Sequence, residues 1–336
     1  MVELFTPCFR IEIDGIDRTL KVWEHLESID YSDAENGESD SLNFTVANDP
    51  SFSIPPPGAK VKFWLGWKEE GGLKYFGAFI IDESTIELNP AQMRISAKSA
   101  NFNSSEKGST SEKQRKDREW ENTTLADLTT KIAAEHSLSS KVEVDVYYPH
   151  IAQTGEGNLS FLQRLASEVG AVFAVKDSTI LIYPPSKGSR PETTIRYTES
   201  VSGSFTAKAR EEYTEVEAKW WDKKEATEKN VSSKRKKKKG NEGSKGGGTT
   251  KHTIKKRYHS ASEAKAAADN QMTLLERGEF EGNLTLPGDP LLVAGAEVTL
   301  QGFSPDALNG RYLAKSVNHS VSKSGWTTGV ELEGLE

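Results

Sequence analysis

The sequence predicts a mainly β protein in which two similar antiparallel β-barrel domains flank an inserted α+β domain. Three observations lead to this fold class. Apolar and polar residues alternate in short runs in the first third and the last third of the chain. Helical spacing of apolar residues is confined to the middle of the chain and one later segment. A block near the N-terminus also recurs near the C-terminus.

The first predicted domain, residues 1–102, is a β-barrel. Alternating runs lie at 9–13, 42–46 and 61–65, and a further short apolar run lies at 79–81. Turn sequences rich in Asn, Asp, Pro and Gly separate these runs. Several short strands at this spacing are typical of a sandwich or barrel.

A charged linker is predicted next, over residues 103–119, which have almost no apolar side chains. The inserted α+β domain follows over residues 120–186. Its first helix should begin at a capping box formed by Thr124 and Asp127.

A second helix is predicted over residues 158–169, with Asn158 as its N-cap and Gly170 as its stop. Two strands should follow, joined by a turn at residues 176–178. This succession of helix, helix and hairpin indicates a small domain with its own core.

The second predicted barrel covers residues 187–336 and is interrupted twice. Residues 223–257 are rich in Lys, Arg and Gly, which predicts a flexible basic segment. Residues 262–277 predict a helix with Ser262 as N-cap and an alanine-rich face that suits packing on a sheet.

Charge is distributed unevenly along the chain. The basic segment 223–257 holds 14 Lys or Arg and three acids, a local charge of +11; since the net charge is −7, the rest carries −18. A body that is this acidic repels nucleic acid. The basic run within the segment is a candidate partner contact, made by Lys234, Arg235, Lys236, Lys237, Lys238 and Lys239.

Three interpretations of this basic run remain open. It can be a solvated loop between strands, a contact with an acidic neighbour in an assembly, or a nucleic-acid site. No aromatic residues interleave the lysines as stacking platforms, which disfavours the third interpretation.

The internal repeat is the most informative feature. Residues 43–50 read NFTVANDP and residues 283–290 read NLTLPGDP. After a loop, Gly-Ala-Lys-Val at 58–61 matches Gly-Ala-Glu-Val at 295–298. Two unrelated hairpins could share this turn chemistry by chance, but the order and spacing favour a duplicated β module. Three such chains in a closed ring would present six similar modules.

The sequence offers little that catalysis could use. No two of the six histidines have ligand spacing with a third partner, so neither a metal nor a cofactor is predicted. His319 lies in a strand pattern and is interpreted as a structural residue, while His136 is interpreted as complementing a helix dipole. Cys8 is interpreted as a small core residue. No apolar run is long enough to predict a membrane span, and the N-terminus lacks a secretory signal.

At this point the chain resembles a known family, the late control protein D family of tail hub proteins in contractile phages and related bacteriocins. It is similar in plan to the hub half of type VI secretion VgrG spikes. The matching segments are 40–50, 57–58, 65–66, 124–138, Gln153, 159–173, 288–300 and 310–333. Family members often have a Glu-Ser-Asp step after the glutamine, where this chain has Gly-Glu-Gly-Asn at 155–158.

The resemblance implies a structural baseplate hub without catalytic activity. It implies a homotrimeric ring that adapts a six-fold tail tube to a three-fold central spike around an axial channel. The implied partners are the spike protein and a tube or tube-initiator protein, with tape measure and baseplate wedge proteins as further candidates. DNA would pass the channel without specific binding, and an acidic lining would help it to slide. The implied location is the tail baseplate of a virion or headless particle assembled in the bacterial cytoplasm.

The chain ends directly after the second predicted barrel, so the spike tip is expected to be a separate polypeptide. Two other functions stay open. A tail-associated peptidoglycan hydrolase would need two carboxylates facing each other across a cleft. A glycan-binding adhesin would need exposed aromatic side chains along a groove.

Overall fold

The computed structural model describes most of the chain. The described residues are 5–34, 40–47, 49, 53–99, 115–144, 146–176, 179–183, 191–207, 213–222, 225–234, 250–258, 261–276 and 280–335.

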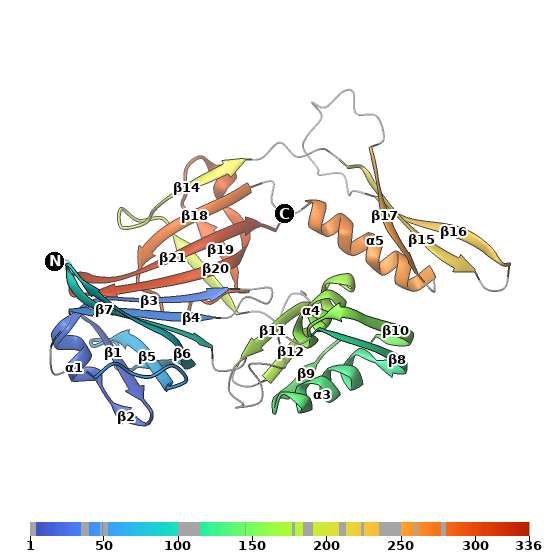
Figure 1. The fold of residues 1–336 in the computed structure, drawn as a ribbon. Coiled ribbons are helices and arrows are strands. Elements are labelled where there is room, and N and C mark those ends of the chain that lie inside the picture. The colour runs from blue at the N-terminus through green and yellow to red at the C-terminus, as the bar shows by residue number, and fades with distance from the viewer. Residues whose placement is uncertain are drawn as a thin grey trace.

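A 13-stranded sheet joins the two ends of the chain and confirms the mainly β fold (Figure 1). The first module contributes β1 (Pro7–Ile13), β2 (Ile16–Asp17), α1 (Thr19–His25), β3 (Leu26–Ala34), β4 (Ser41–Ala47), β5 (Lys60–Trp67), β6 (Lys74–Leu88) and β7 (Ala91–Ser99). The second module contributes β13 (Glu192–Arg196), β14 (Ser202–Ala207), β18 (Phe280–Pro287), β19 (Glu297–Gln301), the 3-10 turn η1 (Asp306–Leu308), β20 (Gly310–Ser322) and β21 (Gly325–Gly334).

The strands of this sheet follow the order β14-β18-β21-β20-β3-β4-β7-β6-β5-β1-β2. β13 lies off this path and pairs with β19, which in turn pairs with β20. The two modules share this sheet, because β3 of the first pairs with β20 of the second. In Figure 1 these strands are stacked from β14 at the top to β7 below.

Each module has a core of alternating inward side chains. Phe44 and Val46 are buried in the first module, and Leu284 and Leu286 occupy the matching positions in the second. This alternation is what the sequence pattern predicted, because one face of each strand is packed and the other is not. The short helix α1 was not predicted, since Val22 is its only buried residue.

The inserted α+β domain folds around two helices. Its elements are β8 (Lys116–Thr124), α3 (Leu125–Glu135), β9 (Ser139–Val142), β10 (Tyr147–Glu156), α4 (Asn158–Glu168), β11 (Val172–Lys176) and β12 (Thr179–Tyr183). β8 and β10 form a two-stranded sheet, and β11, β12 and β9 form a second one. Leucines and isoleucines from both helices share a core with β12.

The predicted helix signals in this domain are confirmed in part. Thr124 is the N-cap of α3, and its hydroxyl oxygen accepts from the Asp127 N–H at 3.1 Å. Gly170 follows the C-cap of α4 with a φ of 70°, as its role as a stop requires. The prediction of Asn158 as an N-cap is wrong. Gly157 occupies that position, and Asn158 begins the helix with its side chain buried among polar groups.

The charged segment before this domain is shorter than predicted. β8 begins at Lys116, inside the predicted linker 103–119, while residues 103–114 lie outside the described part. Arg118 pairs across the ladder with Gln153, so charged side chains form part of this strand. A two-stranded sheet tolerates such side chains because much of its surface faces solvent.

A further unit interrupts the second module. It comprises β15 (Glu215–Asp222), β16 (Thr227–Lys234), β17 (Lys251–Tyr258) and α5 (Ala261–Glu276). The basic segment 223–257 was predicted to be flexible, and this is wrong at its two ends, where β16 and β17 flank β15. Residues 235–249 lie outside the described part.

Helix α5 packs on the three strands of this unit, as its alanine-rich face predicted. Ala264, Ala268 and Met272 are buried against Val216 and Ala218 of β15. The strands were missed because a buried face built from a few small residues produces a weak alternation among so many lysines. The helix begins at residue 261, so Ser262 lies inside its first turn and not at the predicted N-cap.

The Thr124 cap provides a direct test of the local helix assignment. Replacing Thr124 with Ala should destabilise the first turn of α3 by about 1 kcal/mol, because an N–H loses its acceptor. Hydrogen exchange of the amides at 125–128 should accelerate accordingly, while Thr124→Ser should leave it unchanged. Equal exchange in all three proteins would show that the cap contributes nothing.

Candidate assembly site

The two modules match in their backbone hydrogen bonds. Gly58 N–H donates to the Ile81 carbonyl at 2.8 Å, and Ile81 N–H donates to the carbonyl of the residue that follows Gly58 at 3.0 Å. Likewise, Gly295 N–H donates to the Ala314 carbonyl at 2.8 Å, and Ala314 N–H donates to the carbonyl of the residue that follows Gly295 at 2.9 Å. The repeated Gly-Ala segments therefore enter their strands in the same way.

The long strands β6 and β20 match as well. Each has a register shift against its hairpin partner, between Ile81 and Glu83 in β6 and between Ala314 and Ser316 in β20. Each shift comes directly after the residue that is hydrogen-bonded to the Gly-Ala segment, which is Ile81 in β6 and Ala314 in β20. The residue correspondence is therefore continuous from one end of each strand to the other.

The repeated threonines occupy equivalent places. Thr45 of β4 lies opposite Arg94 of β7, and Thr285 of β18 lies opposite Gly329 of β21. The strand order β3-β4-β7-β6-β5 corresponds to β14-β18-β21-β20-β19. The predicted duplication is thus confirmed in strand order and register. One pair of corresponding strands differs in direction, since β1 is antiparallel to β5 whereas β13 is parallel to β19.

The junction between the modules is an antiparallel pairing of β20 with β3. Residues 316–321 of β20 pair with residues 34–29 of β3, in reverse order. The first part of β20, up to Leu313, pairs with β19 instead. One strand therefore serves both modules.

His319 lies at the centre of this junction and is buried. Its ring stacks on Tyr31 with centroids 5.8 Å apart and meets Phe76 edge-on at 5.1 Å. Its Nδ1 accepts from Trp326 Nε1 at 3.3 Å and from the Thr328 hydroxyl at 3.0 Å. Because both donors point at Nδ1, the proton of the neutral ring is on Nε2. The sequence interpretation of His319 as a structural residue is confirmed.

Burial dominates the electrostatics of His319. Desolvation lowers its pKa to about 4, although the Leu292 backbone and the nearby Asp33 carboxylate oppose this shift. Asp33 is itself buried and accepts from the Ala294 N–H at 2.9 Å. A carboxylate of the first module thus satisfies a backbone donor of the second.

The repeated Gly-Asp-Pro turn of the second module also contacts the first. Trp67 Nε1 donates to the Gly288 carbonyl at 2.9 Å, and Lys74 Nζ donates to the Pro290 carbonyl at 2.6 Å. A Cβ at position 288 would lie 2.1 Å from the Trp326 ring, so only glycine fits this turn. The junction therefore combines strand pairing, aromatic packing and buried hydrogen bonds.

The sheet has one polar face, rich in hydroxyl and amide groups, that crosses the junction and is here called the polar face. It lies on the side of the sheet opposite the two cores. Its hydroxyl and amide side chains are Ser28, Ser32, Ser41, Asn43, Thr45, Ser202, Ser204, Thr206, Asn283, Thr285, Asn318, Ser320 and Thr327. Acids such as Asp30 and Glu331 and the bases Arg94 and Lys98 are interspersed with them.

A second polar cluster holds the α+β domain together. Asn158 is buried, and its amide donates to Glu135 Oε2 at 2.9 Å while its Oδ1 accepts from Gln153 Nε2 at 3.1 Å and Arg118 NH2 at 2.5 Å. Burial alone would raise the pKa of Glu135, but hydrogen bonds from Lys116, Arg118 and Asn158 outweigh it and hold this pKa at about 2. The cluster ties the two-stranded sheet of β8 and β10 to both helices.

His136 belongs to the same cluster, which revises its interpretation. It is the C-cap of α3, and its Nε2 lies 2.9 Å from the Asn158 amide nitrogen. Burial and the neighbouring Lys116 lower the pKa of His136. Nε2 therefore accepts a hydrogen bond from the amide. The sequence interpretation had expected His136 to complement the helix dipole with its charge, whereas the ring contributes this hydrogen bond instead.

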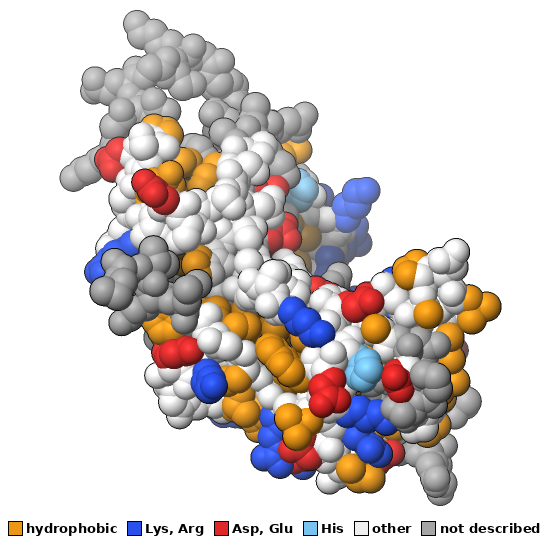
Figure 2. All heavy atoms as spheres, turned by 90° about the vertical axis from the view of Figure 1, so that its left-hand side faces the viewer, with side chains coloured by type: hydrophobic (Ala, Val, Ile, Leu, Met, Phe, Trp, Pro, Cys, Tyr) orange, Lys and Arg blue, Asp and Glu red, His pale blue; other side chains and the backbone are white. Residues whose placement is uncertain are grey.

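The structure describes one residue of the candidate basic run. Lys234 is exposed at the end of β16, opposite Glu215 of β15. Arg235, Lys236, Lys237, Lys238 and Lys239 lie outside the described residues. On the side of the molecule seen in Figure 2, acidic and basic side chains are interspersed among uncharged surface.

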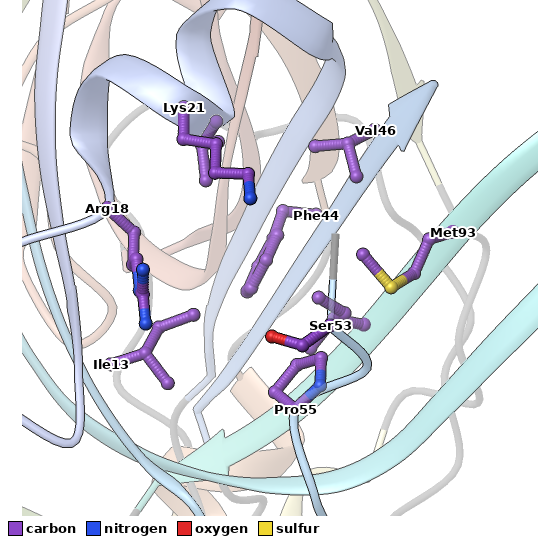
Figure 3. Close-up of a pocket in the computed structure, with 10 residues that line it drawn as sticks. Ile13, Arg18, Lys21, Phe44, Val46, Ser53, Pro55 and Met93 are labelled. Atoms are coloured by element: carbon purple, nitrogen blue, oxygen red, sulfur yellow. The ribbon is translucent and has the colours of Figure 1, made fainter. Parts of the chain in front are cut away.

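A pocket of about 80 Å³ opens beside α1 in the first module (Figure 3). It is lined by Ile13, Arg18, Lys21, Val22, Phe44, Val46, Ser53, Pro55, Met93 and Ile95. A second pocket, lined by Lys141, Glu143, Leu181 and Tyr183, has a single acid. Neither pocket has the two facing carboxylates that glycoside hydrolysis requires.

Metal and membrane sites were searched over the described residues only. Within the ranges given above, no three His, Cys, Asp or Glu side chains are grouped to hold a metal ion. No helix in those ranges combines the length and apolarity that a membrane crossing needs.

His319 predicts a pH dependence of stability. The unfolded chain binds a proton near pH 6.5, whereas the folded ring resists protonation until about pH 4. The free energy of unfolding should therefore fall as the pH drops from 7 to 5, by about 2 kcal/mol from this residue. His319→Gln keeps an acceptor but cannot titrate, so its urea midpoint should fall less over this range. An identical fall in both proteins would contradict the assignment.

The polar cluster predicts a second stability effect. Asn158→Leu should destabilise the α+β domain by about 2 kcal/mol or more, because the buried Gln153 amide and the guanidinium of Arg118 each lose an acceptor. Faster hydrogen exchange in α3 and α4 would be the readout. Ser160→Ala, at an exposed site in the same helix turn, serves as the matched control. Unchanged exchange in the Asn158 variant would show that the cluster is dispensable.

Comparison with known proteins agrees with this architecture. The family model of the phage tail baseplate hub (GPD) matches residues 107–325. A protein named "Probable baseplate hub protein" of Escherichia phage 186 is 28% identical over 367 residues, which cover 97% of this chain and 92% of that one.

Solved structures share the fold at low sequence identity. A tail protein from Neisseria meningitidis has a TM-score of 0.70 at 14% identity, covering 97% of this chain and 96% of that one. An E. coli component of the type VI secretion system has a TM-score of 0.56 at 13% identity, covering 96% and 76%. The match of the family model over most of the sequence is decisive: the chain belongs to the phage tail baseplate hub family.

Proposed function

We propose that three copies of this chain close into a ring of six similar modules around an axial channel. The observation that supports this most is the junction between β20 and β3, which already sets two equivalent modules side by side in one sheet. Repeating the same arrangement with copies of the chain leads to a closed ring, the usual form of homo-oligomers. Three chains supply three-fold symmetry, and their six modules supply near six-fold symmetry.

The polar face lines the channel in this proposal. The core of each module lies on the other side of the shared sheet, and this bulkier side needs the larger outer circumference. The lining then consists mainly of hydroxyl and amide groups, with acids such as Asp30 and Glu331 and the bases Arg94 and Lys98 among them. A wall without a continuous basic surface releases few counterions from DNA, so DNA passes without specific binding.

The function is mechanical in this proposal. The ring lies in the tail baseplate, between a six-fold tube or tube-initiator protein and a three-fold central spike, and it acts without catalysis. Support comes from the family membership, from the duplicated module and from the lack of paired carboxylates in the two pockets described above. Tape measure and baseplate wedge proteins are further partners, and assembly takes place in the bacterial cytoplasm.

The basic run contacts an acidic neighbour in the assembled baseplate. Its first residue, Lys234, is exposed at a strand end, and residues 235–239, which follow it in the sequence, carry five more positive charges. Positive charge at the end of a β-hairpin suits an anionic protein surface, because the pairing steers association even where it adds little affinity.

The ring can be tested by measuring mass and symmetry. In native mass spectrometry the purified chain should have three times the monomer mass of 37.0 kDa, and its complex with the spike protein should contain three copies of the chain. Averaged electron images should show three-fold views with a central hole. A mass of one chain under both conditions would overturn the proposal.

A further inference from the structure

The first module has a strand whose second half lacks a neighbour on one side. Residues 74–80 of β6 pair with β5, whereas residues 83–88 pair with β7 alone in the part of the chain that the structure describes. At the far end of the sheet, β14 pairs only with β18 among the described strands. Among the described strands, both edges therefore have one side without a strand partner, which is the usual template for strand addition.

The module correspondence assigns each of these edges a counterpart in the junction. Residues 83–88 of β6 correspond to 316–321 of β20, since both follow the same register shift. Residues 202–207 of β14 correspond to 28–33 of β3, because Ser202 faces Thr285 as Ser28 faces Thr45. The two counterparts are the strands that pair with each other inside the chain.

Exposed apolar side chains lie in the same half of β6. Ile86 and Leu88 are 38% and 86% exposed. Their counterparts in β20, His319 and Val321, are 1% and 0% exposed because β3 and the first core cover them. The second half of β6 therefore has the side chains of a covered strand and no cover from the residues that the structure describes.

Side-chain chemistry across the two edges is complementary. In the internal junction, Ser320 of β20 donates to the Asp30 carboxylate of β3 at 2.7 Å. Glu87 of β6 stands at the position of Ser320, and Ser204 of β14 stands at the position of Asp30. An acid and a hydroxyl would therefore face each other here too, with the acid on β6 and the hydroxyl on β14. Aromatic character is kept as well, because Phe205 stands where Tyr31 stands.

The internal junction and the two free edges also differ at one position, and a second change compensates for the difference. Asp33 of β3 accepts from the Ala294 N–H at the internal junction. Pro57 stands at the position of Ala294 and has no N–H to satisfy. Correspondingly, residue 207 is an alanine where β3 has its aspartate.

We propose that β6 of one chain pairs antiparallel with β14 of a second copy, in the register that β20 and β3 use internally. Ile86 then lies opposite Phe205, Thr85 opposite Thr206 and Glu87 opposite Ser204. This pairing rests on the proposed ring and makes its closure specific: internal and intermolecular junctions of the same geometry alternate around it.

Engineered cysteines test both the contact and its register. In a Cys8→Ser background, Thr85→Cys/Thr206→Cys should form disulfides between chains and produce covalent dimers and trimers on non-reducing gels. The matched control is Ser32→Cys/Asn318→Cys, which occupies the equivalent pair inside the chain. Its disulfide should close within one chain, visible by peptide mapping. Thr85→Cys/Ser204→Cys, two residues out of register, should cross-link at least several-fold less.

Each outcome separates this contact from the ring itself. If the control closes and the mass is that of a trimer, but Thr85→Cys/Thr206→Cys stays unlinked, the pairing is wrong and the ring stands. Equal linking of the out-of-register pair would overturn the register. A monomer mass throughout would remove both proposals.

A charge substitution provides a second test that needs no cross-link. Ile86→Glu should raise the concentration at which the trimer half-dissociates by at least tenfold, because it buries a carboxylate against Phe205. Ile16→Glu changes another exposed isoleucine, in β2, and should leave the trimer intact. Equal behaviour of the two variants, with circular dichroism confirming that both fold, would contradict the proposal.

Discussion

Where a β-strand extends past its neighbour on one side, the backbone N–H and carbonyl groups of the extension still need hydrogen-bond partners. This constraint governs the molecule, because β20 extends beyond β19 and its free half is taken up by β3. Buried N–H and carbonyl groups without partners cost more than the net gain of an ordinary hydrogen bond. The pairing of β20 with β3 therefore fixes how the two modules lie, and through them the one continuous sheet.

Buried polar side chains make this arrangement specific. Around β20 and β3, His319, Thr328 and Asp33 hold donors and acceptors at defined positions. In the α+β domain, Asn158 and Glu135 do the same between a two-stranded sheet and two helices. Apolar packing alone would allow such elements to shift, whereas a buried hydrogen bond is lost when the geometry changes. Both clusters thus set relative positions more than they add net stability.

Local sequence signals predicted much of the fold. The alternation at 42–46, the capping box at Thr124 and the stop at Gly170 each act over a few residues, so their physics is visible in the chain itself. The repeat at 43–50 predicted the second module because duplicated modules reuse the same turns. The charged strands β16 and β17 were missed, since the small residues of β15 and α5 that bury their inner face lie elsewhere in the sequence.

The candidate site was less accessible to sequence reasoning. His319 could be interpreted as structural, but its partner Tyr31 is distant in sequence, and no pattern links the two positions. Gln153 stood out by family resemblance alone, whereas the structure gives it a reason through its contact with Asn158. Long-range pairing depends on which edges the folded modules leave free, and that is decided only after each module has formed.

The duplicated module has one last consequence. A ring of six identical proteins must repeat every contact six times, so any change in one contact alters all of them. Here His319 of β20 and Ile86 of β6 occupy equivalent positions in two copies of the module within one polypeptide. Each copy can mutate alone, so in the proposed ring alternate sectors can drift apart while the strands keep a common geometry. The proposed ring would thereby combine three-fold and near six-fold symmetry through the chain itself.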